Sequence, residues 1–183
     1  MDYLLNDKDI MKLCGRNTKI VTYPEISDYT SLSELFGKDD KVVILYVNEM
    51  DANSVTGHWC LLTRVVHKNK VIIEFLDPYG MMPDEQLSFY DENWKENSNQ
   101  DENYLTRLLY EASINPEVEI QYNETVLQGS GRNVNTCGRV IGLRAMFYKV
   151  PLDKYQKLWK EFKSRGNNID KAAVTITDAI LKK

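Results

Sequence analysis

The chain has 183 residues, of which 43% are hydrophobic and 27% are charged, and its formal net charge at pH 7 is −4. This length and composition predict one globular domain over residues 1–183, with enough apolar residues to build a core. No apolar run approaches the roughly 18 residues needed to cross a membrane, and the first residues lack the apolar centre of a signal peptide, so we expect neither membrane contact nor secretion.

The first half of the chain predicts two short helices and three strands. Residues 1–13 predict a helix whose apolar stripe consists of Leu4, Leu5, Ile10 and Met11. A second helix has Ser31 as its candidate N-cap and Gly37 as its stop. Three runs rich in β-branched residues follow as predicted strands, at residues 41–49, 57–66 and 70–76. The sequence HKNK joins the last two as a hairpin turn, and the sequence DPYG then ends the sheet segment.

The second half of the chain predicts more helices than strands. Residues 84–103 are polar and acidic, and we expect them to form a surface loop or a short helix. Residues 117–129 alternate through Val118, Ile120 and Tyr122 as a half-buried strand. Predicted helices span residues 104–112, 137–150, 151–166 and 169–183. In helix 151–166, Asp153 is the candidate start, and the side chains expected to face inward are Tyr155, Leu158, Trp159 and Phe162. A sheet in the middle of the chain with helices after it predicts an α+β fold, in which helices flank a central mixed β-sheet.

Charge is distributed unevenly along the chain. Residues 1–138 contain 12 Lys/Arg and 23 Asp/Glu, whereas residues 139–183 contain 11 Lys/Arg and 4 Asp/Glu. A basic C-terminal segment can contact nucleic acid or an acidic partner, but a solvated helix face explains the same charges more simply. The segment has no glycine-rich phosphate loop and no aromatic stacking motif, so the sequence favours the simpler explanation.

The cysteines indicate a reducing compartment. Cys14, Cys60 and Cys137 are few, odd in number and widely spaced, which argues against a disulfide framework. No cysteines and histidines lie at zinc-finger spacing, so we predict no metal site. We predict no cofactor either.

Cys137 stands at the start of the predicted helix 137–150, directly after a polar loop. A helix N-terminus carries partial positive charge and unpaired N–H groups, so a thiol placed there ionises more readily, and the thiolate is the nucleophilic form. Gly138 lets a substrate backbone or another structural element approach closely. The alternative is that Cys137 is a small buried hydrophobic residue, which is the usual role of a free cysteine.

His58 is the candidate base that would activate Cys137. The other histidine, His67, lies in the polar turn HKNK and is most simply a solvated surface residue. His58 lies at the start of a strand beside Trp59, where its ring would be held in place and partly shielded. Taken alone, a histidine in this position is more often structural than catalytic.

Asp77 is the candidate acid that would orient His58. A hairpin at HKNK folds residues 71–77 back along residues 58–66 and brings Asp77 near His58. Glu74 is the rival acid, but it lies an odd number of residues from Asp77 and therefore points to the opposite face. The alternative role for Asp77 is turn formation, because Asp before Pro commonly opens a turn.

An acyl transfer also needs hydrogen-bond donors for the oxyanion that develops during the reaction. The backbone N–H of Cys137 is one candidate donor. Gln128, at the end of a predicted strand just before the loop, offers a side-chain amide. Asn133 and Asn135 are the alternatives, since polar amides are common in loops.

Four short sequences together resemble one family: GHW around His58, FLDPYG around Asp77, LQG around Gln128 and NTCGR around Cys137. In this order they are similar to the adenovirus maturation protease (adenain) and its relatives in virophages and other large DNA viruses. That family shares a cysteine-protease clan with the ubiquitin-like-protein proteases, and the order His, acid, Gln, Cys separates the clan from papain-like enzymes. The resemblance covers about residues 40–150, including the segments MMPDEQLSFY and YLTRLLYEA.

Residue by residue, the resemblance implies His58 as base, Asp77 as orienting acid, Gln128 as oxyanion donor and Cys137 as nucleophile at the N-terminus of a buried helix. Two features depart from adenain. Eight residues separate Gln128 from Cys137, which makes this loop longer than in adenain, and Asp77 stands where adenain has Glu, as in the ubiquitin-like-protein branch.

The resemblance also implies a substrate class and a setting. Viral members of the family cleave capsid and core precursor proteins during virion maturation, which implies the virion and the virus factory of the infected host cell as the location. Adenain is activated by a viral peptide and by DNA, and the basic segment 139–183 is the candidate DNA contact here.

Two classes of alternative stay open from the sequence. The same triad serves proteases for ubiquitin or ubiquitin-like proteins, and acetyltransferases that form an acyl-cysteine. A non-enzymatic virion protein, in which the four residues meet by accident, is the alternative from a different class.

Overall fold

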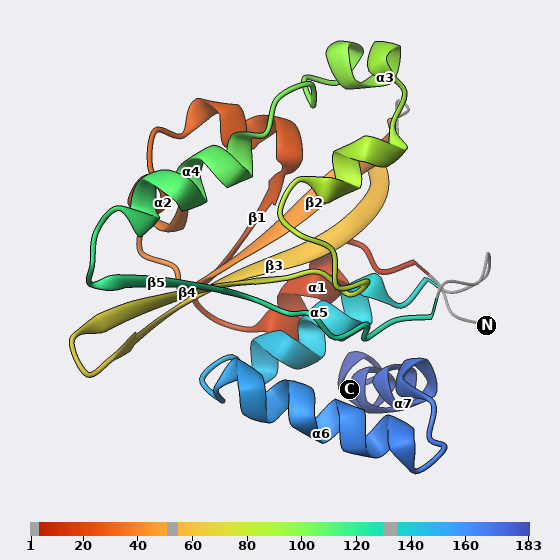
Figure 1. Cartoon of the computed structure of the whole chain (residues 1–183). Coiled ribbons are helices and arrows are strands. Elements are labelled where there is room, and N and C mark those ends of the chain that lie inside the picture. Colours follow the sequence, from red (N-terminus) through yellow and green to blue (C-terminus); the bar gives the residue numbers. More distant parts are fainter. Residues whose placement is uncertain (1–3, 51–54, 130–134) are drawn as a thin grey trace.

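The computed structural model describes residues 4–50, 55–129 and 135–183. A five-stranded mixed sheet forms the middle of the molecule, with helices on both faces (Figure 1). The strands lie side by side in chain order: β1 (Thr18–Thr22), β2 (Lys41–Met50), β3 (Val55–His67), β4 (Lys70–Leu76) and β5 (Val118–Tyr122). The two outer pairs are parallel and the two inner pairs are antiparallel. The predicted α+β fold with a central mixed sheet is confirmed.

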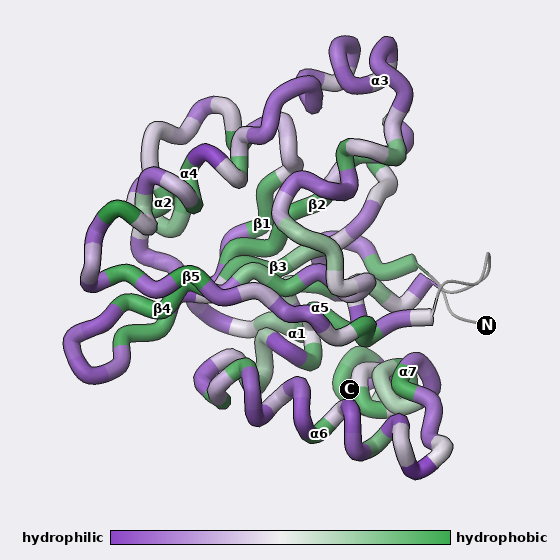
Figure 2. The backbone as a smooth tube through the Cα atoms, viewed as in Figure 1, coloured by the Kyte–Doolittle hydropathy of each residue, from purple (hydrophilic) through white to green (hydrophobic). Residues whose placement is uncertain are grey.

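Each face of the sheet has its own layer of helices and its own hydrophobic cluster. One layer consists of α1 (Asp7–Cys14), α5 (Cys137–Met146), α6 (Leu152–Ser164) and α7 (Ile169–Leu181). The other consists of the 3-10 helix η1 (Tyr23–Asp28), α2 (Leu32–Phe36) and α4 (Tyr104–Ser113), with η2 (Glu85–Phe89) and α3 (Glu92–Asn97) leading into α4. Figure 2 shows hydrophobic residues concentrated in the strands, whereas α3 is hydrophilic. In the described part of the chain, no helix is both long and apolar enough to cross a membrane.

The predicted hairpin between β3 and β4 is confirmed, and it sets the geometry of the site. Lys68 and Asn69 form its two-residue turn, and both have positive φ angles, of 47° and 65°. Such turns match the right-handed twist of the two strands they join. The register that follows places Leu61 opposite Leu76, so the residue after β4 lies beside the middle of β3.

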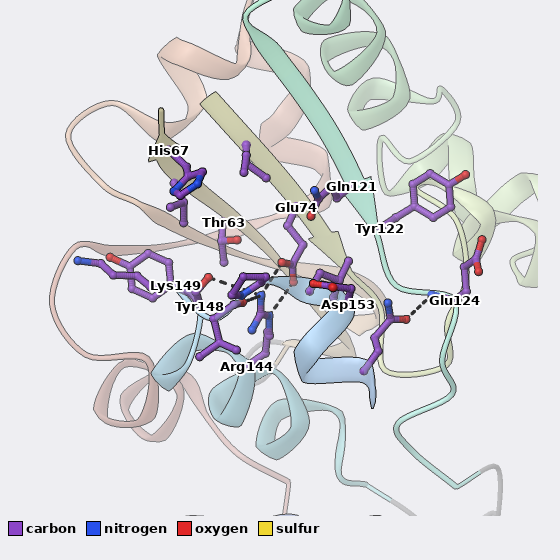
Figure 3. Close-up of a pocket in the computed structure, with 16 residues that line it drawn as sticks. Thr63, His67, Glu74, Gln121, Tyr122, Glu124, Arg144, Tyr148, Lys149 and Asp153 are labelled. Carbon is purple, nitrogen blue, oxygen red and sulfur yellow. Dashed lines mark hydrogen bonds and ion pairs between the residues drawn. The ribbon is translucent and has the colours of Figure 1, made fainter. Parts of the chain in front are cut away.

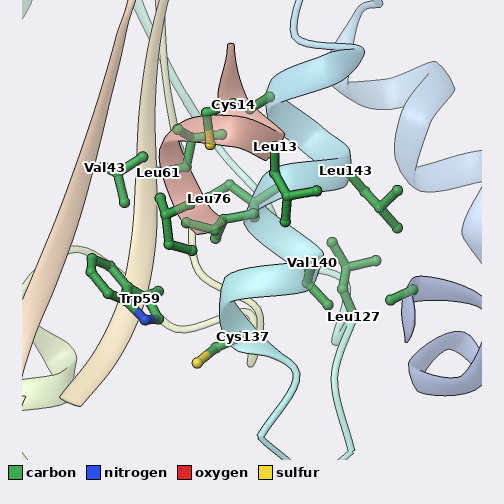
Figure 4. Close-up of a cluster of buried hydrophobic side chains, with 14 of the residues drawn as sticks. Leu13, Cys14, Val43, Trp59, Leu61, Leu76, Leu127, Cys137, Val140 and Leu143 are labelled. Atoms are coloured by element: carbon green, nitrogen blue, oxygen red, sulfur yellow. The ribbon is translucent and has the colours of Figure 1, made fainter. Parts of the chain in front are cut away.

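Helix α5 runs through the interior, and its buried residues continue from Cys137 to Ala145. Glycine lets α1 pack closely against it. A Cβ atom at Gly142 would lie 2.9 Å from Cβ of Leu13, and one at Gly138 would lie 2.9 Å from Cδ1 of Ile10. Gly138 therefore accommodates another element of the fold. Figure 4 shows this packing, with Cys137 at the first turn of α5 and its sulfur projecting from the helix.

Several local predictions were wrong in detail. The first helix begins at Asp7, after a side-chain cap by Asn6, and Leu4 and Met11 of the expected apolar stripe are exposed. Residues 1–3 of that prediction lie outside the described residues. The predicted cap of α2 is confirmed, because Oγ of Ser31 accepts a hydrogen bond from the N–H of Glu34 at 3.1 Å. The predicted stop at Gly37 is also confirmed.

Helix α6 also differs from its prediction. The helix was expected to start at Asp153, but it begins at Leu152, with Pro151 in the N-cap position. Leu158 was expected to face inward, but it is exposed. The helix buries Tyr155 and Trp159, which are four residues apart and therefore lie on one face. Leu158 precedes Trp159 by one residue, which places its side chain about a quarter turn away from that face.

Candidate functional site

The hairpin brings His58 and Asp77 together, as predicted. Asp77 is the first residue after β4, and its Oδ2 lies 3.0 Å from Nε2 of His58. Both side chains are almost fully buried. Glu74 points to the opposite face, where Nε and a terminal nitrogen of Arg144 donate hydrogen bonds to its two oxygens. The rival acid is therefore excluded by strand geometry and by its own partner.

A glycine and a β-bulge fix the position of His58. The pairing of β2 with β3 shifts between Val47 and Glu49, opposite Gly57. A Cβ atom at Gly57 would lie 1.8 Å from the carbonyl oxygen of Tyr46, so only glycine allows this close approach of the two strands. The backbone directly before His58 is thus held by contact with β2.

Asp77 is also held by Cys60, Tyr79 and Asn123, three residues outside the predicted site. Its Oδ1 accepts the N–H of Tyr79 at 2.6 Å, and its Oδ2 also accepts the thiol of Cys60 at 3.2 Å. Asn123, just after β5, accepts the backbone N–H of Asp77 at 2.9 Å and donates to its carbonyl oxygen at 2.7 Å. The spacing of Cys60 from His58 is a usable signal, because residues two apart on a strand share a face. Nothing in the sequence distinguishes Asn123 from other loop amides.

Cys137 is the first residue of α5, as predicted, and its side chain interacts with His58. Burial alone lowers the pKa of His58, but hydrogen bonds and charges from Asp77 and Cys137 outweigh burial and raise it to about 9. Nε2 of His58 is directed at Asp77, which leaves Nδ1 for the thiol. This arrangement favours the protonated form of His58 beside the side chain of Cys137.

We expect the imidazole of His58 to titrate near pH 9, which NMR can measure. The chain has two histidines, so a His67→Gln variant leaves one imidazole signal to follow. Asp77→Asn removes the carboxylate charge and should lower this pKa by at least about 1. A wild-type midpoint at or below the ordinary value of 6.5 would contradict the arrangement.

The sign of the effect on stability follows from the same pKa. The folded-state pKa of His58 lies above its ordinary value, so protonated His58 stabilises the fold fully below about pH 6.5. This contribution to the free energy of unfolding is lost as pH rises through about 9. Urea denaturation at both pH values, with His58→Ala as control, measures it.

Gln128 lies at the same site, joined to it through Tyr79. The ring of Tyr79 stacks on the ring of His58 with centroids 5.0 Å apart, and its hydroxyl accepts the side-chain amide of Gln128 at 3.4 Å. Burial raises the pKa of Tyr79, and the charges of Cys137, Asp77 and Asp170 add to this effect. The longer loop has therefore not removed Gln128 from the site. Of the alternative donors, Asn135 is exposed and Asn133 lies outside the described residues.

The other two cysteines are buried thiols with little tendency to ionise. Burial raises the pKa of Cys14 to about 12, although the charge of Lys41 opposes it. Burial also raises the pKa of Cys60 well above its ordinary value, and the charge of Asp77 adds to this. Cys14 is buried because α1 packs this residue into the core beneath the sheet.

His58, Cys60 and Asp77 form a group of metal-ligand side chains within the described ranges, with donor atoms within 4.8 Å of one another. Hydrogen bonds explain the arrangement, since one oxygen of Asp77 accepts from both neighbours. All three side chains are buried against one another. The absence of a metal and of a cofactor stays a prediction.

A cavity of about 430 Å³ lies away from this group, between the sheet and the start of α6 (Figure 3). The ion pair of Glu74 and Arg144 lies in its wall, and Thr63 and Tyr148 also line it. None of the four candidate catalytic residues lines this cavity. Although the cavity is large, it therefore lies apart from the candidate catalytic residues.

No protein-family model matches the chain. A Sputnik virophage protein named "Uncharacterized protein V9" is 29% identical over 153 residues, which are 84% of this chain and 81% of that protein. Among solved structures, the ASFV pS273R protease aligns with a TM-score of 0.41 and 14% identity, over 79% of this chain. The chain matches 56% of the length of that protease. Neither similarity names the adenain family, so that resemblance stays a prediction.

Proposed function

We propose that this protein is a cysteine endopeptidase that cleaves viral capsid or core precursor proteins during virion maturation. The observation that supports the chemistry best is the buried pair of His58 and Asp77, with Cys137 close enough to raise the pKa of His58. Gln128 supports it further, because its amide lies beside the ring that stacks on His58.

In the proposed mechanism, Asp77 holds the ring of His58 and stabilises its charged form. The thiolate of Cys137 attacks the carbonyl carbon of the substrate peptide and forms a C–S bond, while the N–H of Cys137 and the amide of Gln128 bind the oxyanion. The C–N bond breaks as His58 gives its proton to the leaving amine. Water then hydrolyses the thioester, with His58 as base, and the free thiol is restored.

The proposed setting rests on the Sputnik virophage relative and on the resemblance noted in the sequence. We propose the virion and the virus factory of an infected cell as the place of action, with an activating peptide and DNA as candidate partners. The exposed lysines of α6 lie within the basic segment proposed to contact DNA.

The test of the proposed chemistry is the rate of iodoacetamide labelling at each cysteine against pH, read by mass spectrometry. Cys137 should react fast below pH 7, and His58→Ala should reduce that rate at least about tenfold, because the thiolate loses its partner. Cys14 and Cys60 should stay unlabelled in the folded protein, because burial raises the pKa of both thiols and leaves little reactive thiolate. Labelling of all three in urea is the control for reagent access.

Equal and slow labelling of the three cysteines in folded wild type would contradict an activated nucleophile.

A second experiment distinguishes the substrate classes, by testing a panel of capsid precursors, ubiquitin-like C-terminal probes and acetyl-CoA. Turnover of the probes or of acetyl-CoA, without cleavage of precursors, would overturn the maturation role while retaining the triad.

A further inference from the structure

One carboxylate links the two chain segments that carry Gln128 and Cys137. Oδ2 of Asp170, in the first turn of α7, accepts the backbone N–H of Gly129 at 3.0 Å. Oδ1 of the same side chain accepts the hydroxyl of Thr136 at 2.5 Å. Gly129 directly follows Gln128, and Thr136 directly precedes Cys137. Asp170 therefore fixes both segments relative to one another.

The role of Thr136 is unusual for its position. Thr136 is the N-cap residue of α5 and is fully buried, yet its side chain makes no capping hydrogen bond. An N-cap threonine ordinarily accepts a hydrogen bond from an N–H in the first helical turn. Here the hydroxyl is directed to α7 instead, so it ties the residue before Cys137 to that helix.

Helix α7 is a firm support for Asp170. Arg139 of α5 is almost fully buried and donates hydrogen bonds to Thr177 at 2.6 Å and to Asp178 at 2.7 Å. The side chain of Asn168 caps the start of α7. Hydrogen bonds from Thr136 and from Arg139 thus join the start of α5 to α7. Asp170, the partner of Thr136, also binds Gly129, which follows Gln128.

We infer that Asp170 is a positioning residue, which sets the distance between the oxyanion donor Gln128 and the nucleophile Cys137. This inference rests on the proposed function. Asp170→Asn keeps the shape of the side chain but removes the negative charge that strengthens both hydrogen bonds, and its NH2 group can meet Thr136 only if the hydroxyl turns round to accept. Displacement of a reacting group by about 1 Å can cost about 100-fold in rate.

The test compares Asp170→Asn with Asp178→Asn, a matched change on the same helix that loosens α5 at Arg139 only. Asp170→Asn should lower kcat for peptide cleavage about 100-fold with little change in KM, and Asp178→Asn should stay within about threefold of wild type. Thr136→Val should reproduce the loss and Thr136→Ser should restore activity, because serine keeps the hydroxyl. Urea denaturation should show similar stability for the two Asn variants.

Equal kcat values for the two Asn variants, or for Thr136→Val and Thr136→Ser, would overturn the inference. Hydrogen exchange at the Gly129 amide separates this outcome from failure of the proposed function. If wild type neither cleaves peptide nor shows fast labelling of Cys137, the proposed function fails. Faster exchange in Asp170→Asn would then still support the link, and unchanged exchange would overturn it.

Discussion

Cys137→Ala should abolish peptide cleavage, with a loss of at least about 10⁴-fold in kcat, while the fold is retained. The loss is large because the variant has no atom that can form the acyl bond, whatever the geometry of the remaining residues. The fold should survive because Cys137→Ala removes only one sulfur atom from the hydrophobic cluster. Initial rates with a cleavable precursor and far-UV circular dichroism measure the two effects.

The matched control is Cys14→Ala, which removes a buried thiol from the same cluster. Cys14 lies in α1 and takes no part in the group around His58, so this variant should keep wild-type cleavage after correction for stability. Cleavage by Cys137→Ala at more than a few per cent of the wild-type rate would exclude Cys137 as the nucleophile.

Arg144→Met should lower the free energy of unfolding by roughly 3–5 kcal/mol, because it leaves the carboxylate of Glu74 buried without its cation. The pair is nearly inaccessible to water, and the hydrogen bonds from Arg144 to Glu74 are 2.8 and 2.6 Å long. Arg144 also donates to the carbonyl oxygens of Phe147 and Val150, which lie in the segment between α5 and α6. Urea denaturation followed by tryptophan fluorescence measures the loss.

The double variant Glu74→Leu with Arg144→Met separates the two causes. It removes the unpaired charge and should recover part of the stability, because an apolar pair fills a similar volume. Recovery should be incomplete, since the two carbonyl oxygens still lack their donor. If Arg144→Met alone costs less than about 1 kcal/mol, the pair does not stabilise the fold as proposed.

The sequence predicted the central elements of the site because these depend on short-range signals. The turn HKNK fixes the register of β3 and β4, and that register determines the meeting of His58 with Asp77. Side chains alternate between the two faces of a strand, so the three-residue step from Glu74 to Asp77 was enough to predict which acid faces His58. The hydrogen bond from Arg144 to Glu74 was not needed for this prediction. Hydrophobic spacing was likewise enough to place α4 and α5 and to make Cys137 a helix start.

The residues that were missed act through contacts between distant segments. Asp170 reaches Thr136 across 34 positions, and Asn123 reaches Asp77 across 46. Polar residues of these types are common in loops and first helical turns, so local pattern gives no reason to choose them. Leu158 is an error of the opposite kind, a residue that was predicted to be buried and is not. Its apolar side chain fits the helical spacing of α6, but the fold covers only the face that carries Tyr155 and Trp159.

The hairpin has a consequence for the order in which the site is assembled. His58 and Asp77 are 19 residues apart and meet through the pairing of two neighbouring strands, which is among the fastest contacts a chain can form. Cys137 comes 60 residues after Asp77, and it reaches them only when α5 docks beneath the sheet. During synthesis, the strands that carry His58 and Asp77 therefore leave the ribosome before Cys137 does. In the proposed protease, the triad is complete only after Cys137 has been synthesised and α5 has packed against the sheet, so we expect a growing chain to lack activity.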